Sequence, residues 1–180
     1  MDIIRAEERH LAAIQQIYAW HVTNGSASFE TAPPDIEEMR ARLAKIRSAG
    51  LPWFVLLEAG VVKGYCYLAA YRTRYAYRYT LEDSIYVDRD FRHRGAGSAL
   101  LAKAVEWAER HGYRQLIAVV GNSENAASLG VHKKAGFSIS GTLQNVGFKH
   151  GRWLDIVIMQ RTLGEGAQTL PHREPGRQSA

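Results

Sequence analysis

Between residues 78 and 111, a strand leads directly into a glycine-rich turn and then a helix. Polar and apolar side chains alternate along residues 78–88, as they do in a half-buried strand. The turn reads Arg92-His93-Arg94-Gly95-Ala96-Gly97-Ser98, and an apolar stripe then predicts a helix to about residue 111. Small residues at the mouth of a helix leave its first backbone N–H groups open, so this corner favours the binding of an anion.

The spacing of the glycines narrows the kind of anion site. Leu100 stands where a dinucleotide-binding Gly-x-Gly-x-x-Gly motif has its third glycine, and the Gly-Lys-Ser/Thr ending of a P-loop is missing. The remaining pattern, Arg-x-x-Gly-x-Gly after a strand, suits a pyrophosphate at the helix N-terminus, with positive charge from Arg92, His93 and Arg94. The simpler alternative is that the glycines only turn the chain and the arginines face solvent.

The other elements extend this unit into a mixed sheet. Further strands are predicted at 2–6, 53–58, 62–71, 115–120, 138–147 and 153–162, and further helices at about 8–23, 35–50 and 124–135. The order β-α-α-β-β-β-α-β-α-β-β predicts an α/β (α+β) protein with one central mixed sheet and helices on both faces. Residues 1–163 are expected to form one domain, and residues 164–180, rich in Gly, Pro, Gln, Ser and Arg, a disordered tail.

Composition bounds the compartment and the partners. No run of the 180 residues approaches the roughly 18 apolar residues of a membrane span, and the start lacks a signal-peptide pattern. The single cysteine, Cys66, fits a reducing compartment, so a cytoplasmic protein without a membrane partner is expected. His, Cys, Asp and Glu residues lack metal-site spacing, so no metal is expected. The net charge of +5 fits either a polyanionic small cofactor or a nucleic acid.

Three segments in this order resemble the GNAT superfamily of N-acetyltransferases, and within it the phosphinothricin/methionine sulfoximine acetyltransferase subgroup. They are residues 79–87 (YTLEDSIYV), 125–137 and 147–155. The resemblance covers about residues 2–163. It implies the GNAT acyl-CoA N-acyltransferase fold, acetyl-CoA as co-substrate and a homodimer. It also implies direct transfer of the acetyl group, in a ternary complex, to the primary amine of a small amino-acid-like substrate.

The same resemblance implies a cofactor site. Backbone groups of Ile85, Tyr86 and Val87 would contact the pantetheine arm. The turn would hold the pyrophosphate with His93, Arg94, Gly95, Ala96, Gly97 and Ser98. Asn125 would hydrogen-bond the pantetheine near the thioester, and Lys134 would lie near the phosphates.

Glu82 is the predicted general base, because an amine attacks a thioester only as the neutral species. Its carboxylate lies in a strand rich in Tyr, Leu, Ile and Val, where burial would raise its pKa. The alternative is a structural ion pair with Arg78, four residues earlier on the same face.

His132 is the predicted acid for the departing thiolate. Most of the superfamily has Tyr at this position, and the subgroup commonly has His, so the resemblance carries the acid role over to His132. The alternative is a structural histidine on a helix.

The acceptor site is predicted around an arginine-rich loop. A guanidinium pairs bidentately with a carboxylate, which suits an amino-acid substrate. The resemblance places six residues around the acceptor: Arg72, Thr73, Arg74, Glu82, Asp83 and Ser84. The subgroup often has Pro where this chain has Thr73. The alternatives are a solvated arginine edge or a basic-aromatic nucleic-acid patch.

Other functions remain open at this point. The same fold could acetylate a protein N-terminus or a lysine, or could bind an acyl-CoA as a noncatalytic sensor. A nucleic-acid-binding module would leave the glycines at the start of the helix without a role, so no nucleic acid partner is expected.

Overall fold

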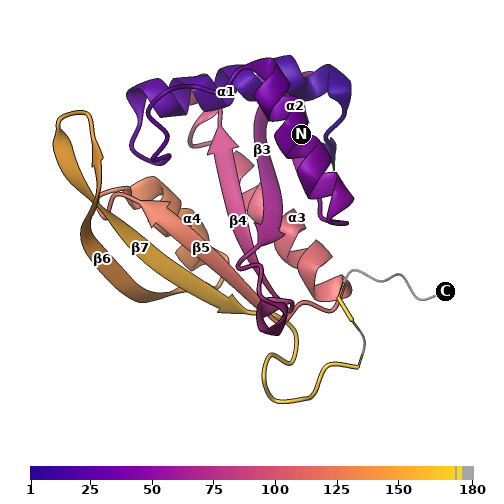
Figure 1. Ribbon diagram of the computed structural model, residues 1–180. Helices are drawn as coiled ribbons and strands as arrows, with labels where there is room; N and C mark the ends of the chain where they lie inside the picture. The colour runs from indigo at the N-terminus through magenta and orange to yellow at the C-terminus, as the bar shows by residue number, and fades with distance from the viewer. Residues whose placement is uncertain (173, 176–180) are drawn as a thin grey trace.

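The computed structural model describes residues 1–172, 174 and 175. Within these residues, seven strands form one mixed sheet in the order β1-β2-β3-β4-β5-β7-β6 (Figure 1). The strands are β1 (Asp2–Arg5), β2 (Trp53–Glu58), β3 (Val61–Ala70), β4 (Thr80–Val87), β5 (Gln115–Gly121), β6 (Ser138–Lys149) and β7 (Arg152–Thr162). Among the recorded pairs, β4 and β5 run parallel and the others antiparallel.

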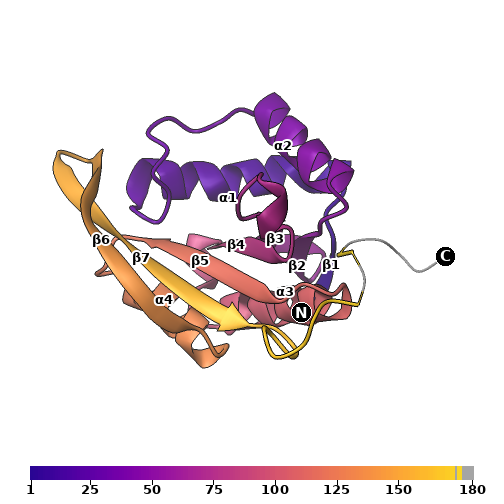
Figure 2. The same cartoon turned by 60° about the horizontal axis from the view of Figure 1, so that its bottom comes forward.

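Helices cover both faces of the sheet, which confirms the predicted fold class. Helices α1 (Leu11–Asn24) and α2 (Ile36–Ser48) lie on one face, and α3 (Ala96–Arg110) and α4 (Ala126–Lys134) on the other (Figure 2). Short 3-10 turns occupy Glu8–His10, Tyr75–Tyr77 and Arg89–Phe91. No helix in the described part of the chain is long and apolar enough to cross a membrane.

Local sequence explains where the helices begin and which faces they bury. The Asp35 carboxylate accepts a hydrogen bond from the Glu38 backbone N–H (2.8 Å), so it caps α2. The buried stripe of α2 is Met39, Leu43 and Ile46. Helix α3 buries Leu100, Leu101, Ala104, Val105 and Ala108, the residues that its periodicity predicted.

The two parallel strands separate halfway along their length. Residues 80–83 of β4 pair with residues 115–118 of β5, and the recorded pairing ends at Asp83 and Ala118. Beyond that point β4 continues to pair with β3, and β5 with β7. The strands diverge toward their C-terminal ends in Figure 1, and we call the region between these diverging ends the opening.

The hairpin of β6 and β7 is longer than the sequence predicted. Strand β6 extends to Lys149 because the turn takes only His150 and Gly151, both with left-handed backbone conformations (φ 54° and 72°). Register shifts between Ile139 and Gly141 and between Leu143 and Gly147 bend the strand, which lies at the edge of the sheet. The hairpin consequently projects beyond the sheet (Figure 1).

The segment predicted to be a disordered tail covers residues 164–180, of which 173 and 176–180 lie outside the described residues. Its first part contacts the domain. The Arg114 guanidinium donates hydrogen bonds to the Gly166 carbonyl (2.7 Å) and to the Thr169 hydroxyl (2.9 Å). Farther on, the Glu174 carboxylate pairs with Arg78 (3.2 Å).

Candidate active site

A pocket of about 350 Å³ lies at the opening between β4 and β5. Side chains of β4, β5, β6 and β7 line it, together with the loop that follows α1. The lining residues are Ala27, Ser28, Phe29, Glu82, Tyr86, Val119, Gly121, Val146 and Ile156. Glu82 is the one carboxylate among them, so the pocket brings a single acidic group against a largely apolar wall.

Glu82 has the environment expected of a base. Its side chain is half-buried, and burial raises the pKa of this carboxyl above its ordinary value; the neighbouring charge of Asp83 adds to the rise and Arg72 opposes it. The alternative ion pair is not what the structure describes for Arg78. That guanidinium pairs with Glu174 and lies over the rings of Tyr75 (4.0 Å) and Tyr79 (4.7 Å).

The glycine turn has an open, cationic form. His93 and Gly95 both adopt left-handed conformations (φ 61° and 79°), and α3 begins directly after them at Ala96. A Cβ built on Gly95 would meet no atom within 4 Å, so space for a ligand lies in front of the turn. The first amides of α3 have no helical acceptor and carry the positive end of the helix dipole. Arg94 and His93 are exposed beside them.

The end of β4 offers a backbone edge to the same opening. Residues 85–87 pair with β3 on one side, whereas the pairing with β5 has ended. His21 fixes this edge from α1, because its Nε2 donates to the Val87 carbonyl oxygen (2.8 Å). His21 falls in the helix predicted at about 8–23, but the sequence gave no indication of this contact, which joins residues 66 positions apart.

Helix α4 carries two more residues that were predicted to bind the cofactor. Asn125 caps the helix, since its side-chain oxygen accepts a hydrogen bond from the Ser128 N–H (3.3 Å). Lys134 is exposed at the other end, nine residues and about 13 Å farther along the axis. The two side chains can therefore contact different parts of one extended ligand.

Sequence comparison agrees with this arrangement of turn, strand edge and pocket. The pattern of the acetyltransferase (GNAT) family matches residues 14–137, more than half of the chain. The chain belongs to the GNAT acetyltransferase family. The phosphinothricin N-acetyltransferase of Alcaligenes faecalis is 53% identical over 161 residues, which cover 89% of this chain and 82% of that protein.

Two further matches extend over nearly the whole length of this chain. The L-methionine sulfoximine/L-methionine sulfone acetyltransferase of Salmonella typhimurium is 35% identical over 93% of this chain and 97% of that protein. The crystal structure of a GNAT superfamily phosphinothricin acetyltransferase from Sinorhizobium meliloti, in complex with AcCoA, has a TM-score of 0.93 and 42% identity. That match covers 97% of this chain and 94% of the other, and it confirms the GNAT fold.

The structure divides the predicted acceptor residues of this GNAT protein into two groups. Arg72, Thr73 and Arg74 are exposed on the loop before β4, and Ser84 lies on the Glu82 face, opposite Tyr67 of β3. Asp83 does not belong with them. Strand alternation turns its side chain away from Glu82, and it is buried.

Asp83 instead pairs with His132. The His132 Nε2 lies 2.8 Å from the Asp83 Oδ1, and its Nδ1 lies 2.8 Å from the Ser128 carbonyl oxygen. Burial opposes protonation of His132, but the hydrogen bond and the charge of Asp83 outweigh it and raise the pKa of the imidazole. His132, predicted as the acid, therefore has both ring nitrogens engaged within the protein.

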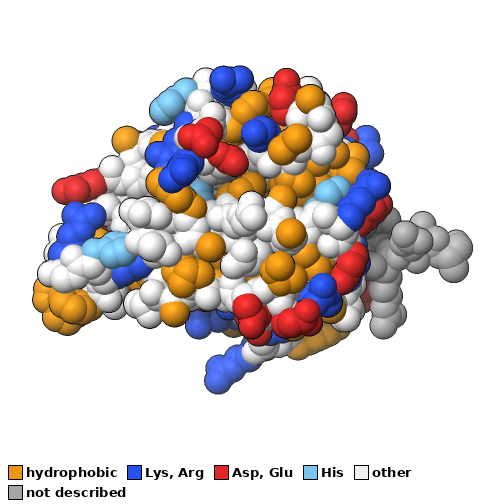
Figure 3. Space-filling model, turned by 90° about the horizontal axis from the view of Figure 1, so that it is seen from above, with side chains coloured by type: hydrophobic (Ala, Val, Ile, Leu, Met, Phe, Trp, Pro, Cys, Tyr) orange, Lys and Arg blue, Asp and Glu red, His pale blue; other side chains and the backbone are white. Residues whose placement is uncertain are grey.

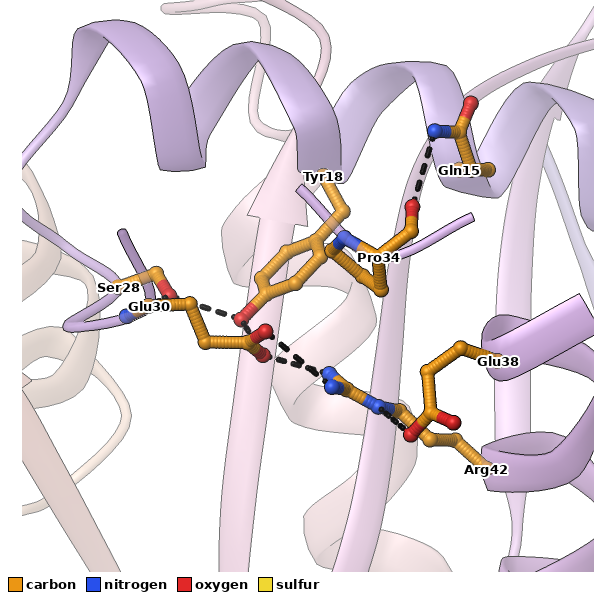
Figure 4. Close-up of polar contacts among 7 residues, drawn as sticks. All are labelled: Gln15, Tyr18, Ser28, Glu30, Pro34, Glu38 and Arg42. Carbon is orange, nitrogen blue, oxygen red and sulfur yellow. Dashed lines mark hydrogen bonds and ion pairs between the residues drawn. The ribbon is translucent and has the colours of Figure 1, made fainter. Parts of the chain in front are cut away.

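One wall of the pocket consists of part of the loop between α1 and α2. The Tyr18 hydroxyl lies 2.7 Å from the Ser28 Oγ and donates to Glu30 (2.6 Å), and Arg42 of α2 binds Glu30 with both terminal nitrogens (Figure 4). From the other side, the buried Lys149 ammonium donates to the Ser28 carbonyl (2.8 Å). Three separate segments, α1, α2 and β6, thus hold residues 28–30 in place, and we call these residues the acceptor loop.

Two glycines let residues 26–29 lie directly on the sheet. A Cβ at Gly121 of β5 would lie 2.6 Å from the Ser26 carbonyl oxygen, closer than real atoms approach. A Cβ at Gly147 of β6 would lie 2.3 Å from the ring of Phe29. The Phe29 ring therefore packs on the bare backbone of β6, and side-chain patterns could not predict this contact.

Proposed function

We propose that this GNAT enzyme transfers the acetyl group of acetyl-CoA to the primary amine of a small amino-acid-like acceptor. The proposed acceptors are of the phosphinothricin, methionine sulfoximine or methionine sulfone type. The observation that carries the proposal is the Glu82 carboxyl, with its raised pKa, in a pocket at the opening between β4 and β5. The names of the relatives at 53% and 35% identity support the acceptor type.

Glu82 would act first, by taking a proton from the acceptor ammonium directly or through a water molecule. The neutral nitrogen then attacks the thioester carbonyl, and the thiolate of coenzyme A departs. A positioned base of this kind contributes roughly 10²–10⁴-fold to the rate. We propose a main-chain N–H near Val87 as the donor that stabilises the oxyanion.

Direct transfer is proposed because the single cysteine of the chain is unsuited to form an acetyl-enzyme. Cys66, its single cysteine, is fully buried, and burial raises the pKa of the thiol well above its ordinary value. A thiol without access to solvent and without thiolate character is not reactive. The acetyl group therefore passes from donor to amine in one ternary complex.

The donor would lie along the strand edge and the glycine turn. Residues 85–87 would bind the pantetheine arm through their backbone, and residues 93–98 the pyrophosphate, with Asn125 and Lys134 at the two ends of α4. The space in front of Gly95 supports this assignment. When bound, acetyl-CoA supplies the activated acetyl thioester.

Charged side chains would hold one end of the acceptor, and apolar side chains would contact the other. Arg72 and Arg74 would pair with its carboxylate, a fork geometry that suits guanidinium groups. Its side chain would pack against Phe29, Val119, Val146 and Ile156. The pocket volume, about 350 Å³, is at the small end of ligand pockets, which favours a single amino acid over a peptide.

A panel assay tests the function. Thiol release from acetyl-CoA is measured with phosphinothricin, methionine sulfone, methionine sulfoximine and short peptides, for the wild type and for Glu82→Gln. We expect turnover of the small acceptors and a fall of at least about tenfold in kcat for the variant, with acetyl-CoA affinity nearly unchanged. Turnover of peptides alone would favour a protein acetyltransferase, and binding without turnover would favour a sensor.

We further propose a homodimer formed through the β6–β7 hairpin. Five large apolar side chains there are 47–65% exposed: Ile139, Leu143, Val146, Phe148 and Trp153. Hydrophobic side chains gather at the left edge of Figure 3, the side on which the hairpin projects. Exposed apolar patches of this kind mark interaction surfaces. Light scattering should give twice the mass of one chain, and Trp153→Glu should lower it; a wild-type monomer would overturn the dimer.

The domain boundary and location complete the proposal. We propose that residues 1–163 suffice for acetyl transfer, since the pocket and the turn lie within them. A chain that ends after residue 163 and retains its kcat would support this boundary. A cytoplasmic location is proposed because the buried Cys66 has no disulfide partner, and cell fractionation tests it.

A further inference from the structure

The Asp83–His132 contact stands apart from the other ion pairs of the described residues. Its side chains are 2% and 5% exposed, whereas the partners in every other recorded pair are 26% exposed or more. A buried charge pair is costly to form and is weak evidence for stability by itself. The position of the Asp83–His132 pair in the fold therefore has to explain why the pair is there.

The pair lies where the sheet divides. Asp83 is the last residue of β4 that pairs with β5, opposite Ala118, and the opening begins directly after it. His132 comes from α4, which follows β5 after only a short connection. The contact thus links the strand on one side of the opening to the helix that belongs to the other side.

We propose that Asp83 and His132 are positioning residues, whose pair fastens α4 to β4 and thereby fixes the width of the opening that receives the acyl donor. The inference rests on the proposed function for the identity of that donor. It assigns His132 a different part from the acid role expected from sequence. Neither residue touches the reacting atoms on this account.

The hydrogen-bond directions support this assignment. The Ser128 carbonyl can only accept, so the His132 Nδ1 carries a proton. Nε2 faces a carboxylate at 2.8 Å, and a second proton on it makes a buried imidazolium–carboxylate pair. Both N–H groups then point at protein atoms. A thiolate of pKa about 8.5 is able to leave without an acid.

Two titratable groups lie next to the pair, and the charge of Asp83 affects the pKa of both. Glu82 is the next residue of β4, and Cys66 lies on β3; the Asp83 charge adds to the rise in pKa that burial causes in each. Removal of this charge should lower the pKa of Glu82. The activity of Asp83→Asn should then persist to lower pH than that of the wild type, which a purely structural role would not produce.

The test is a double-mutant cycle of Asp83→Asn and His132→Gln. Acetyl-CoA affinity is measured by calorimetry, and kcat across pH with a small acceptor. Each single variant leaves one buried group without its charged partner, so donor affinity should fall about tenfold. The double variant can keep an amide–amide contact and should recover to within about threefold of the wild type. His111→Gln is the matched control, since its Nδ1 also bonds a carbonyl four residues earlier (2.7 Å) but has no recorded carboxylate partner.

The outcomes separate the two roles. Recovery of both donor affinity and kcat in the double variant, with an unchanged alkaline limb of the pH profile, supports the positioning role. A double variant with kcat as low as that of His132→Gln would show that the imidazole itself is needed and would overturn the inference. If a single variant fails to fold, the double variant alone decides. If no amine is acetylated by the wild type, the proposed function fails, while donor affinity still tests the pair.

Discussion

Gly147→Ala should disturb the acceptor wall without disturbing the fold. The added Cβ would lie 2.3 Å from the Phe29 Cε2, whereas ordinary contact begins near 3.4 Å. The ring therefore has to move by about 1 Å. Phe29 is 37% exposed and can shift toward solvent, so the free energy of unfolding should fall by only about 1 kcal/mol.

The kinetic effect should be larger than the effect on stability. A displacement of about 1 Å in a substrate-positioning group can cost on the order of 10²-fold in rate. We expect kcat/KM for the small acceptor to fall about 10- to 100-fold, with the KM for acetyl-CoA unchanged. Steady-state kinetics with each substrate varied in turn measures both. Gly141→Ala is the matched control, because a Cβ there meets nothing within 4 Å on the same strand. Equal acceptor kinetics in the two variants would refute the placement of Phe29 in the acceptor wall.

Three further predictions test the donor site, the acceptor loop and the buried pair. Gly97→Ala should weaken acetyl-CoA binding at least about tenfold in calorimetry without loss of thermal stability, because the new Cβ would make ordinary contact with Val131 (3.6 Å) and only a ligand would clash. Unchanged affinity would mean that the donor does not approach this backbone. Tyr18→Phe loses the hydroxyl that bonds Ser28 and Glu30, so acceptor KM should rise while the free energy of unfolding falls by about 1–2 kcal/mol in urea titrations; a rise confined to acetyl-CoA KM would contradict the role of the loop. The pKa of His132 is raised above its ordinary 6.5, so the stabilisation from its charged pair should be complete below about pH 6.5 and lost as pH rises through the folded-state pKa. The unfolding free energy of the wild type should therefore fall relative to that of Asp83→Asn/His132→Gln between pH 6 and pH 9. A constant difference would count against the charged pair.

The elements proposed to hold the donor could be predicted because their evidence is local. The strand, the glycine turn and α3 are consecutive in the chain, so periodicity and residue size predict both the elements and their junction. The alternation of β4 also put Asp83 on the face opposite Glu82. The resemblance groups Asp83 with Glu82 and Ser84, although the strand turns neighbouring side chains to opposite sides.

The contacts that hold the acceptor loop, and the Asp83–His132 pair, could not be predicted, because they join residues far apart in sequence. Lys149 and Ser28 are 121 positions apart, and His132 and Asp83 are 49 apart. Local patterns determine which residues are helical or extended, but not which side chains meet across the sheet. The bulges of β6 made the pocket harder to predict, since they change which residues of the hairpin face it.

The base assigned to Glu82 is tested most directly by the pH dependence of kcat/KM for the small acceptor at saturating acetyl-CoA. The account predicts that wild-type activity falls at acidic pH through a pKa above the ordinary carboxyl value of 4.5, since burial raises it. It also predicts that Glu82→Gln loses this limb together with most of its rate. A variant that retains both the limb and the rate would contradict the assignment of Glu82 as the base.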